Sequence, residues 1–168
     1  IDAVSLKDGR VAVTFQQQGG EIGMEIIDTR DATNSTPVYS PDSWQVGTNG
    51  DDTFTATSAI AHGHEGNDNI SDGSGVNALF GDGGDDIINI NTVESAESAD
   101  GGTGIDTLLG TSMSSGTVYD LAAGTVTLNA ITESATNFEN VTGSIADESF
   151  FGTTGANVIR GNGGDDFI

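Results

Sequence analysis

Cysteine is absent from the 168-residue sequence, which excludes disulfide bonds and thiolate metal sites. Basic residues are nearly absent too, because 4 Lys and Arg stand against 26 Asp and Glu, giving a formal net charge of -22. The chain therefore lacks the cationic side chains that binding to nucleic acid or to an anionic membrane surface requires. No apolar run approaches the roughly 20 residues of a membrane-spanning helix, so no span is predicted. The acidic excess also opposes compaction unless a cation is bound.

Proline occurs only at Pro37 and Pro41, within the segment STPVYSPDSW. Three of the four basic residues precede this segment, whereas the sequence from Val46 onward contains 19 acids and one base, Arg160. The paired prolines and the change in charge predict a boundary, so residues 1–45 are interpreted as the end of an upstream β domain plus a linker.

The segment before the boundary has the pattern of short antiparallel strands. Asp8-Gly9 lies between alternating apolar residues, and Gly19-Gly20 offers a second turn, so a short antiparallel β meander is predicted. The sequence starts without Met and stops within a repeated pattern, from which we expect a fragment of a longer protein.

A nine-residue unit recurs after the boundary. The stretch from His62 to Asn89, HGHEGNDNISDGSGVNALFGDGGDDIIN, divides from Gly63 into GHEGNDNIS, DGSGVNALF and GDGGDDIIN. Further copies begin at Gly47, Gly101, Gly143, Gly152 and Gly161. The fourth position is usually glycine and the sixth usually Asp, and the eighth is apolar in Phe54, Ile70, Leu79, Ile88, Leu108, Phe150, Ile159 and Ile168.

This spacing predicts tight turns that alternate with very short strands. Glycine permits positive φ in the first six residues, and the last three form a strand whose single apolar side chain points inward. Two units complete one coil, and coils must stack because no unit can bury its own apolar residue. We therefore expect an all-β fold, a parallel β-roll or β-helix-like solenoid.

The unit resembles the RTX (repeats-in-toxin) nonapeptide G-G-x-G-x-D-x-U-x of hemolysin-type calcium-binding proteins, over about residues 46–168. The resemblance implies Ca²⁺ ions between turns stacked on the same side, held by Asp carboxylates and by carbonyls of the glycine turns. The implied ligands are the sixth-position acids Asp52, Asp68, Asp86, Asp106 and Asp166, with the turn glycines Gly50, Gly66, Gly84, Gly104 and Gly164.

Stacking predicts two blocks of repeats. In residues 46–109 the turns that start at 47, 63, 81 and 101 share one side, whereas the other side has Asn77 or no Asp, which predicts a one-sided ladder of up to three ions. In residues 143–168 an ion would be shared by Asp166 with either Asp147 or Glu148.

A spacer, residues 110–142, separates the two blocks. Strands are expected at Val118–Leu121 and at Val126–Leu128, joined by Ala122-Ala123-Gly124, and another within Asn137–Ser144. Its V-D-L-x-x-G and E-N-V-x-G-S patterns are similar to stretches that interrupt repeats in RTX proteins, so we expect it to continue the stack.

Several alternative sites have weaker support. The glycine-rich turns lack the Gly-Lys-Ser/Thr of a phosphate-binding loop, and the acids lack EF-hand spacing. His62 and His64 are either a short zinc clip or variable turn residues, and the latter is more typical where no third ligand is available. The phenylalanines Phe150, Phe151 and Phe167 are interpreted as core or flanking packing residues, with contact of an exposed aromatic pair to a sugar ring as the alternative.

The favoured function is a calcium-binding segment that folds and is stabilised on calcium uptake outside the cell, as the secretion, folding and structural module of a larger exported bacterial protein. The resemblance implies type I secretion and a location outside the cell or on the bacterial surface. Its partners would be calcium ions and the remainder of its own chain. Two alternatives are an adhesive extender of a surface or biofilm protein, and an accessory module of an extracellular enzyme that binds polysaccharide. We find no nucleophile, base or cofactor motif, so any catalysis is expected outside this segment.

Overall fold

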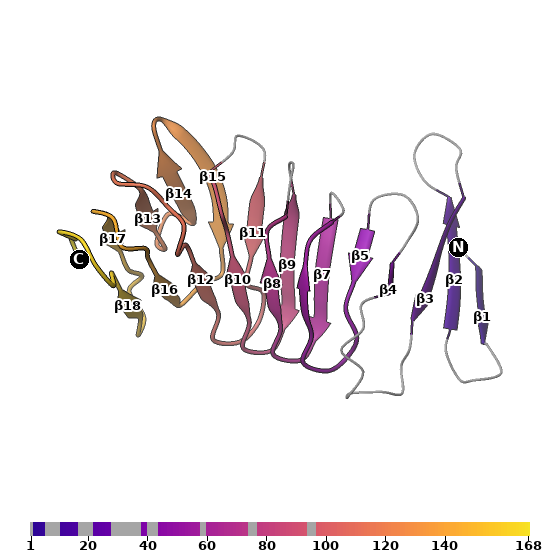
Figure 1. Ribbon diagram of the computed structural model, residues 1–168. Helices are drawn as coiled ribbons and strands as arrows, with labels where there is room; N and C mark the ends of the chain where they lie inside the picture. Colours follow the sequence, from indigo (N-terminus) through magenta and orange to yellow (C-terminus); the bar gives the residue numbers. More distant parts are fainter. Residues whose placement is uncertain are drawn as a thin grey trace.

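The computed structural model describes residues 2–5, 11–16, 22–27, 38–39, 44–57, 60–73, 77–93 and 97–168. Within these ranges all regular structure is β, with no helix. Most strands stack along one axis as the two walls of a flattened coil, with the N-terminal strands at one end and β17 and β18 at the other (Figure 1). The expected all-β roll is confirmed.

The N-terminal sheet has three antiparallel strands: β1 (Asp2–Ser5), β2 (Val11–Gln16) and β3 (Ile22–Ile27). This sheet is the predicted meander. The two predicted turns and both prolines lie outside the described residues.

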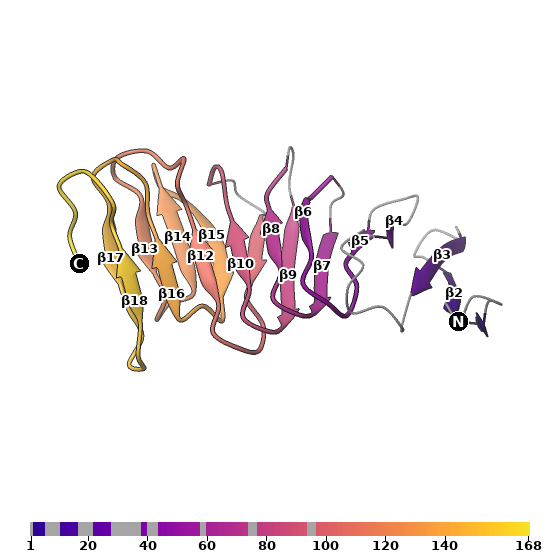
Figure 2. The ribbon, with the colours of Figure 1, turned by 60° about the horizontal axis from the view of Figure 1, so that its bottom comes forward.

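The first wall of the roll is a six-stranded sheet in which every neighbour is parallel. Its strands, side by side in Figure 2, are β6 (Thr53–Thr55), β8 (Asn69–Ser71), β10 (Ile87–Asn89), β12 (Thr107–Leu109), β16 (Asn140–Thr142) and β18 (Val158–Arg160).

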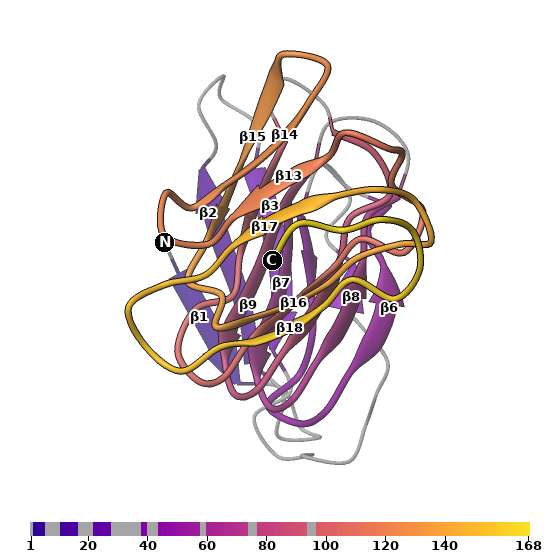
Figure 3. The same ribbon diagram turned by 90° about the vertical axis from the view of Figure 1, so that its left-hand side faces the viewer.

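The second wall has nine strands in the order β17-β13-β14-β15-β11-β9-β7-β5-β4. Their bounds are β4 (Val38–Tyr39), β5 (Trp44–Val46), β7 (Ile60–Glu65), β9 (Ala78–Gly83), β11 (Ser98–Asp100), β13 (Val118–Asp120), β14 (Thr125–Leu128), β15 (Ile131–Thr136) and β17 (Ser149–Phe151). Figure 3, a view along the roll, shows the two walls facing each other with turns joining them at both edges.

The register confirms two nine-residue units per coil. Phe54 pairs with Ile70, Ile70 with Ile88, and Ile88 with Leu108, so successive strands of the first wall are 16, 18 and 20 residues apart. These steps are the spacings of the turns at 47, 63, 81 and 101. The next step, from Leu108 to Val141, is longer because the spacer lies between them.

The core is a thin layer of inward side chains from both walls. Ile70, Ile88 and Leu108 are completely buried, and all of the predicted eighth-position residues from Phe54 to Phe150 join the buried cluster. Ile159 is partly buried against it. Ile168 was expected to point inward like the others but is 68% exposed.

The spacer extends the second wall, as expected, but with one strand more than the sequence indicated. β13 and β14 are the two predicted strands and pair antiparallel, and β15 follows as a strand that the prediction missed. β15 then pairs in parallel with β11, and the β14–β15 hairpin projects beyond neighbouring strands (Figures 1 and 3). Tyr119 stacks on Phe150 with a centroid distance of 5.0 Å, which joins the spacer to the second block through the core.

No helix among the residues that the structure describes is long and apolar enough to cross a membrane.

The inward–outward alternation can be tested at two adjacent isoleucines of β10. Ile88 is completely buried, whereas Ile87 is 37% exposed. We expect Ile88→Ala to lower the free energy of unfolding by about 2–5 kcal/mol through loss of buried area and the remaining cavity, and Ile87→Ala by less than about 1 kcal/mol. Urea unfolding of both variants in one buffer measures the difference, and similar losses would contradict the register.

Candidate metal centre

Four turns stack along one edge of the roll and bring the predicted acids into line. Each turn joins a strand of the second wall to a strand of the first, which begins just after the sixth-position acid of the turn. Asp68 immediately precedes β8 and Asp86 immediately precedes β10. Parallel pairing of the strands therefore places the acids one above another, in the order Asp52, Asp68, Asp86, Asp106.

Hydrogen bonds connect each acid to the next. The amide of Asp52 donates to Asp68 Oδ1 at 2.8 Å, that of Asp68 to Asp86 Oδ1 at 2.7 Å, and that of Asp86 to Asp106 Oδ1 at 2.8 Å. We call this row of four residues the acid ladder. It confirms that the turns at 47, 63, 81 and 101 lie on one side.

The ladder acids are buried, with 0–2% of their surface exposed, and each keeps one carboxylate oxygen without a hydrogen bond among the described residues. These oxygens are Oδ2 of Asp68, Asp86 and Asp106, and Oδ1 of Asp52. A buried charged oxygen that lacks a partner is costly. The arrangement therefore calls for a positively charged ligand in the turns.

The first glycine of each turn leaves open the space beside that oxygen. A Cβ atom at Gly81 would overlap both Asp86 Oδ2 and the carbonyl oxygen of Gly101, and Gly63 has the same relation to Asp68 Oδ2 and the Gly81 carbonyl. Carboxylate and carbonyl oxygens from consecutive turns thus converge where a side chain is missing.

Backbone conformation divides the turns into two kinds. In the turns at 63, 81, 101 and 161 both the second and the fourth residue have positive φ, and the fourth is always glycine: Gly66, Gly84, Gly104 and Gly164. At Gly84, φ is +129° and a Cβ atom would overlap the Gly66 carbonyl, so glycine is required there.

In the turn at 47, by contrast, the second residue is Thr48, whose amide and hydroxyl both donate to Asp52 Oδ2. The hydroxyl of Thr48 lies 3.0 Å from that oxygen. In this turn local hydrogen bonds satisfy one of the two carboxylate oxygens, although Gly50 occupies the fourth position as predicted.

The fifth-position residues form a second, outer row. The amide of Asn67 donates to Asp51, that of Asp85 to Asn67, and that of Ile105 to Asp85, at 2.7–2.9 Å. Asp51 and Asp85 are exposed, unlike the ladder acids beside them. Each Asp-Asp pair therefore has one inner and one outer member.

In the second block, the turns at 143 and 161 stack in the same way. The amide of Glu148 donates to Asp166 Oδ1 at 3.0 Å, and Glu148 is 3% exposed. The exposed Asp147 belongs to the outer row, where it accepts from the amide of Asp165. Of the two predicted partners of Asp166, the inner position is occupied by Glu148, whose carboxylate also accepts from the amide and hydroxyl of Ser144.

Two glutamates that the sequence analysis missed occupy positions equivalent to the acids. Glu97 accepts a hydrogen bond from the amide of Asn77 at 3.3 Å, on the opposite side of the roll. Glu139 accepts from the amide of Asp106 at 2.9 Å. Glu139 lies two residues before the core residue Val141, as Asp86 lies two before Ile88, and this spacing was available in the sequence.

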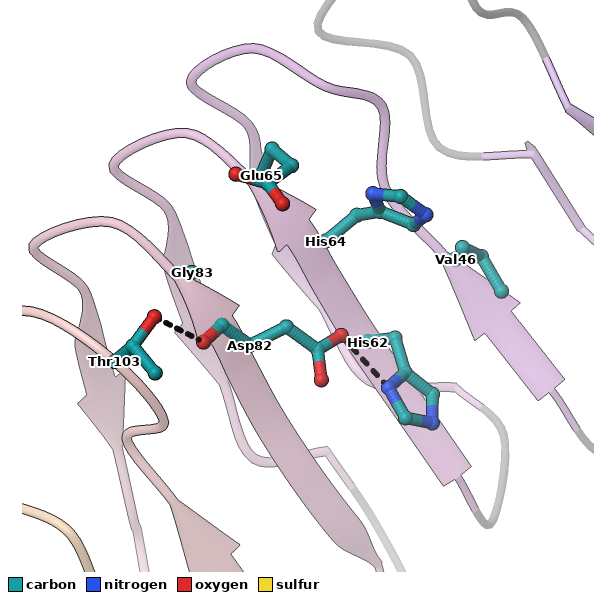
Figure 4. Close-up of a pocket in the computed structure, with 7 residues that line it drawn as sticks. All are labelled: Val46, His62, His64, Glu65, Asp82, Gly83 and Thr103. Atoms are coloured by element: carbon teal, nitrogen blue, oxygen red, sulfur yellow. Dashed lines mark hydrogen bonds and ion pairs between the residues drawn. The ribbon is translucent and has the colours of Figure 1, made fainter.

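A separate pocket lies beside the ladder, lined by Val46, His62, His64, Glu65, Asp82, Gly83 and Thr103 (Figure 4). His62 Nδ1 lies 2.8 Å from Asp82 Oδ2, and its ring stacks on Phe80 at 4.6 Å. Burial tends to raise the pKa of Asp82, but the hydrogen bond and charge of His62 outweigh it, so the pKa is lowered. His64, at φ +82°, is the second residue of its turn.

Of the three phenylalanines considered as packing or sugar-binding residues, one lies in the core and two are exposed. Phe150 is buried against Tyr119. Phe151 and Phe167 are 44% and 61% exposed and lie 5.8 Å apart, tilted by 50°. Phe150 is thus a core residue, as predicted.

The donor set of the ladder fits calcium. Among the described residues, no group of three or more His, Cys, Asp or Glu side chains is placed to hold a metal ion, so a ligand set here must combine one or two carboxylates with backbone carbonyls. Calcium prefers six to eight such oxygen ligands in a flexible geometry. Asp68, Asp86 and Asp106, with the carbonyls of Gly81 and Gly101, are the residues that would hold it.

The pKa values of the ladder acids indicate how costly their charges are without a cation. Burial, reinforced by neighbouring carboxylates and opposed by the hydrogen bond from the adjacent amide, raises the pKa of Asp68 to about 7 and that of Asp106 to about 6. Burial also raises the pKa of Asp86. Protons and a metal cation therefore compete for these oxygens.

A pH dependence of the metal-free chain follows. Because the pKa values of Asp68 and Asp106 are raised from 3.8 in the folded state, their stabilisation is full below about pH 4 and is lost as the pH rises through about 6 to 7. We expect the far-UV β signal of the chain in metal-depleted buffer to fall between pH 5 and pH 8, and to fall less in Asp68→Asn. A β signal that rises with pH in the unaltered chain would contradict the burial of these charges.

Comparison with known proteins gives an independent assignment. Residues 61–89 and 142–168 match the family model described as RTX calcium-binding nonapeptide repeat (4 copies). The search for similar curated proteins found no match. The matched segments include the turns at 63, 81, 143 and 161, whose acids are stacked in the structure. These two segments are therefore RTX calcium-binding nonapeptide repeats.

Proposed function

We propose that this calcium-binding structural repeat module folds and is stabilised on calcium uptake outside the cell, and serves as the secretion, folding and structural module of a larger exported protein. The observation that carries the proposal is the acid ladder, in which four buried carboxylates each keep an oxygen without a hydrogen bond among the described residues.

The balance of forces in the roll supports dependence on calcium. Most strands of the roll contribute one inward apolar side chain, worth at most about 3 kcal/mol each. Ordering the backbone costs roughly 1–2 kcal/mol per residue, and more at glycine. Residues from Val46 onward also contain 19 acids and only Arg160 as a base. Calcium offsets the repulsion, and its binding free energy contributes directly to folding.

Export follows from the same property. RTX proteins typically leave the cell by type I secretion, unfolded where calcium is scarce, and fold outside where it is abundant. A location outside the cell or on the bacterial surface supplies the calcium that the ladder requires. The partners proposed are calcium ions and the rest of the protein's own chain, and any catalytic activity is assigned to that remainder.

The first test is a calcium titration of the 168-residue chain, followed by far-UV circular dichroism. We expect a cooperative gain of β signal at roughly 0.1–1 mM calcium, the affinity range of extracellular calcium modules, and no comparable gain with magnesium. A full β signal in chelator that calcium does not change would show that the core is stable alone and would refute calcium-dependent folding.

A matched pair of variants tests the inner position against the outer. Asp86 is buried within the ladder, whereas the neighbouring Asp85 is exposed, and replacing either with Asn removes one negative charge while keeping an acceptor oxygen. We expect Asp86→Asn to weaken calcium affinity about tenfold or more, because its carboxylate lies between two stacked turns. Asp85→Asn should change affinity less than about threefold. Calorimetric titration measures both, and equal losses would contradict the assignment.

A further inference from the structure

The acid ladder continues into the spacer through a shortened turn, Asn137–Glu139. Asp100 pairs with Thr136 in the second wall, and Leu108 pairs with Val141 in the first. Three residues therefore cross from wall to wall where the turn above, Gly101–Asp106, uses six. In this register Asn137 takes the place of a first glycine and Glu139 that of a sixth-position acid.

The oxygen atoms around this junction repeat those of the regular turns. The amide of Asp106 donates to Glu139 Oε2 at 2.9 Å, as the amide of Asp86 donates to Asp106 Oδ1 at 2.8 Å. A Cβ atom at Gly101 would overlap the carbonyl oxygen of Asn137, as one at Gly81 would overlap the carbonyl oxygen of Gly101. The longer side chain of Glu139 thus brings its carboxylate to the position that Asp occupies elsewhere.

A buried oxygen without a partner points into the same space. Asp106 has no exposed surface, and its Oδ2 accepts no hydrogen bond among the described residues. The same oxygen lies within contact distance of the position that a Cβ atom at Gly101 would occupy, next to the Asn137 carbonyl. The junction therefore contains a buried carboxylate oxygen, Asp106 Oδ2, whose negative charge would be offset by a bound cation.

Hydrogen bonds at both ends of the short turn and a buried side chain in its middle hold it in place. Asn137, at φ +58°, donates from Nδ2 to Asp100 Oδ1 at 2.7 Å, and Phe138 packs into the core with 3% exposure. The carbonyl of Glu139 accepts a hydrogen bond from Asn157 Nδ2 at 2.8 Å. The carbonyl of Asn137 and the carboxylate of Glu139 are thus positioned before any ligand binds.

We propose that Asp106, Asn137 and Glu139 form an additional calcium site at the junction of the first repeat block and the spacer, a proposal that rests on the calcium-dependent function above. Its ligands are Asp106 Oδ2, the Asn137 carbonyl and the Glu139 carboxylate. The short turn lacks the three residues that would supply further carbonyls, so this site binds calcium more weakly than the Asp68–Asp86 site. Calcium then fastens the spacer to the first repeat block.

The test is the number of calcium ions bound by Glu139→Gln, counted by native mass spectrometry and by calorimetric titration. Gln retains an acceptor for the Asp106 amide but removes the charge. We expect one ion fewer than the unaltered chain binds, with the tighter sites changed less than about threefold. Asp120→Asn removes one charge from the same spacer, where Asp120 accepts from the amide of Ala123, and should leave the number unchanged.

An unchanged number and unchanged affinities in Glu139→Gln would overturn the site while leaving calcium binding by the regular turns intact. Failure of the unaltered chain to bind calcium at all would instead refute the function on which the site rests. If Glu139→Gln does not fold, Glu139→Asp decides the question. It keeps the charge on a shorter side chain, so we expect affinity to fall about tenfold at one site only, and wild-type affinity at every site would overturn the proposal.

Discussion

The hydrogen bond from the amide of one sixth-position residue to the carboxylate of the next is the interaction on which the rest of the roll depends. It links Asp52, Asp68, Asp86 and Asp106, and it can form only if successive turns are in register. The same register stacks the core residues and pairs the strands. It also buries one carboxylate per turn, and a buried charge in a thin protein is tolerated only with a counter-ion. The register that orders the core therefore also aligns the carboxylates that form the proposed calcium sites.

Variation among the turns shows how the chain adjusts that arrangement. In the turns at 63, 81 and 101, which have positive φ at the second and fourth residues, Oδ2 of the sixth-position acid has no hydrogen bond among the described residues. In the turns at 47 and 143, the hydroxyls of Thr48 and Ser144 donate to the acid of their own turn. Hydrogen bonds from Thr48 to Asp52 and from Ser144 to Glu148 thus stabilise part of the buried negative charge that a cation would otherwise neutralise. The outer row, represented by Asp85, adds amide contacts between turns without burying charge, so two adjacent acids in one repeat have different physical roles.

The spacer is a structural continuation of the roll rather than an interruption. Its hairpin widens the second wall, and Tyr119 stacks on Phe150 in the core. The carboxylate of Glu139 accepts a hydrogen bond from the amide of Asp106 at the end of the ladder. The two segments that match the RTX repeat family, residues 61–89 and 142–168, are consequently joined by strands that share their register. Stacking order is thus maintained even where the nonapeptide pattern is lost.

The sequence alone determined the repeat, its two units per coil, the side on which Asp52 to Asp106 lie and the inward position of residues such as Ile88. Each of these depends on the nine-residue period, which can be read from neighbouring residues of the sequence. Only the tertiary structure decided that Glu148 rather than Asp147 is the inner acid, that Thr48 donates to Asp52, that β15 exists, and that Glu139 lies next to Asp106. These features depend on which strand lies beside which. Strand pairing across 33 residues, from Leu108 to Val141, follows from packing in three dimensions rather than from the local period.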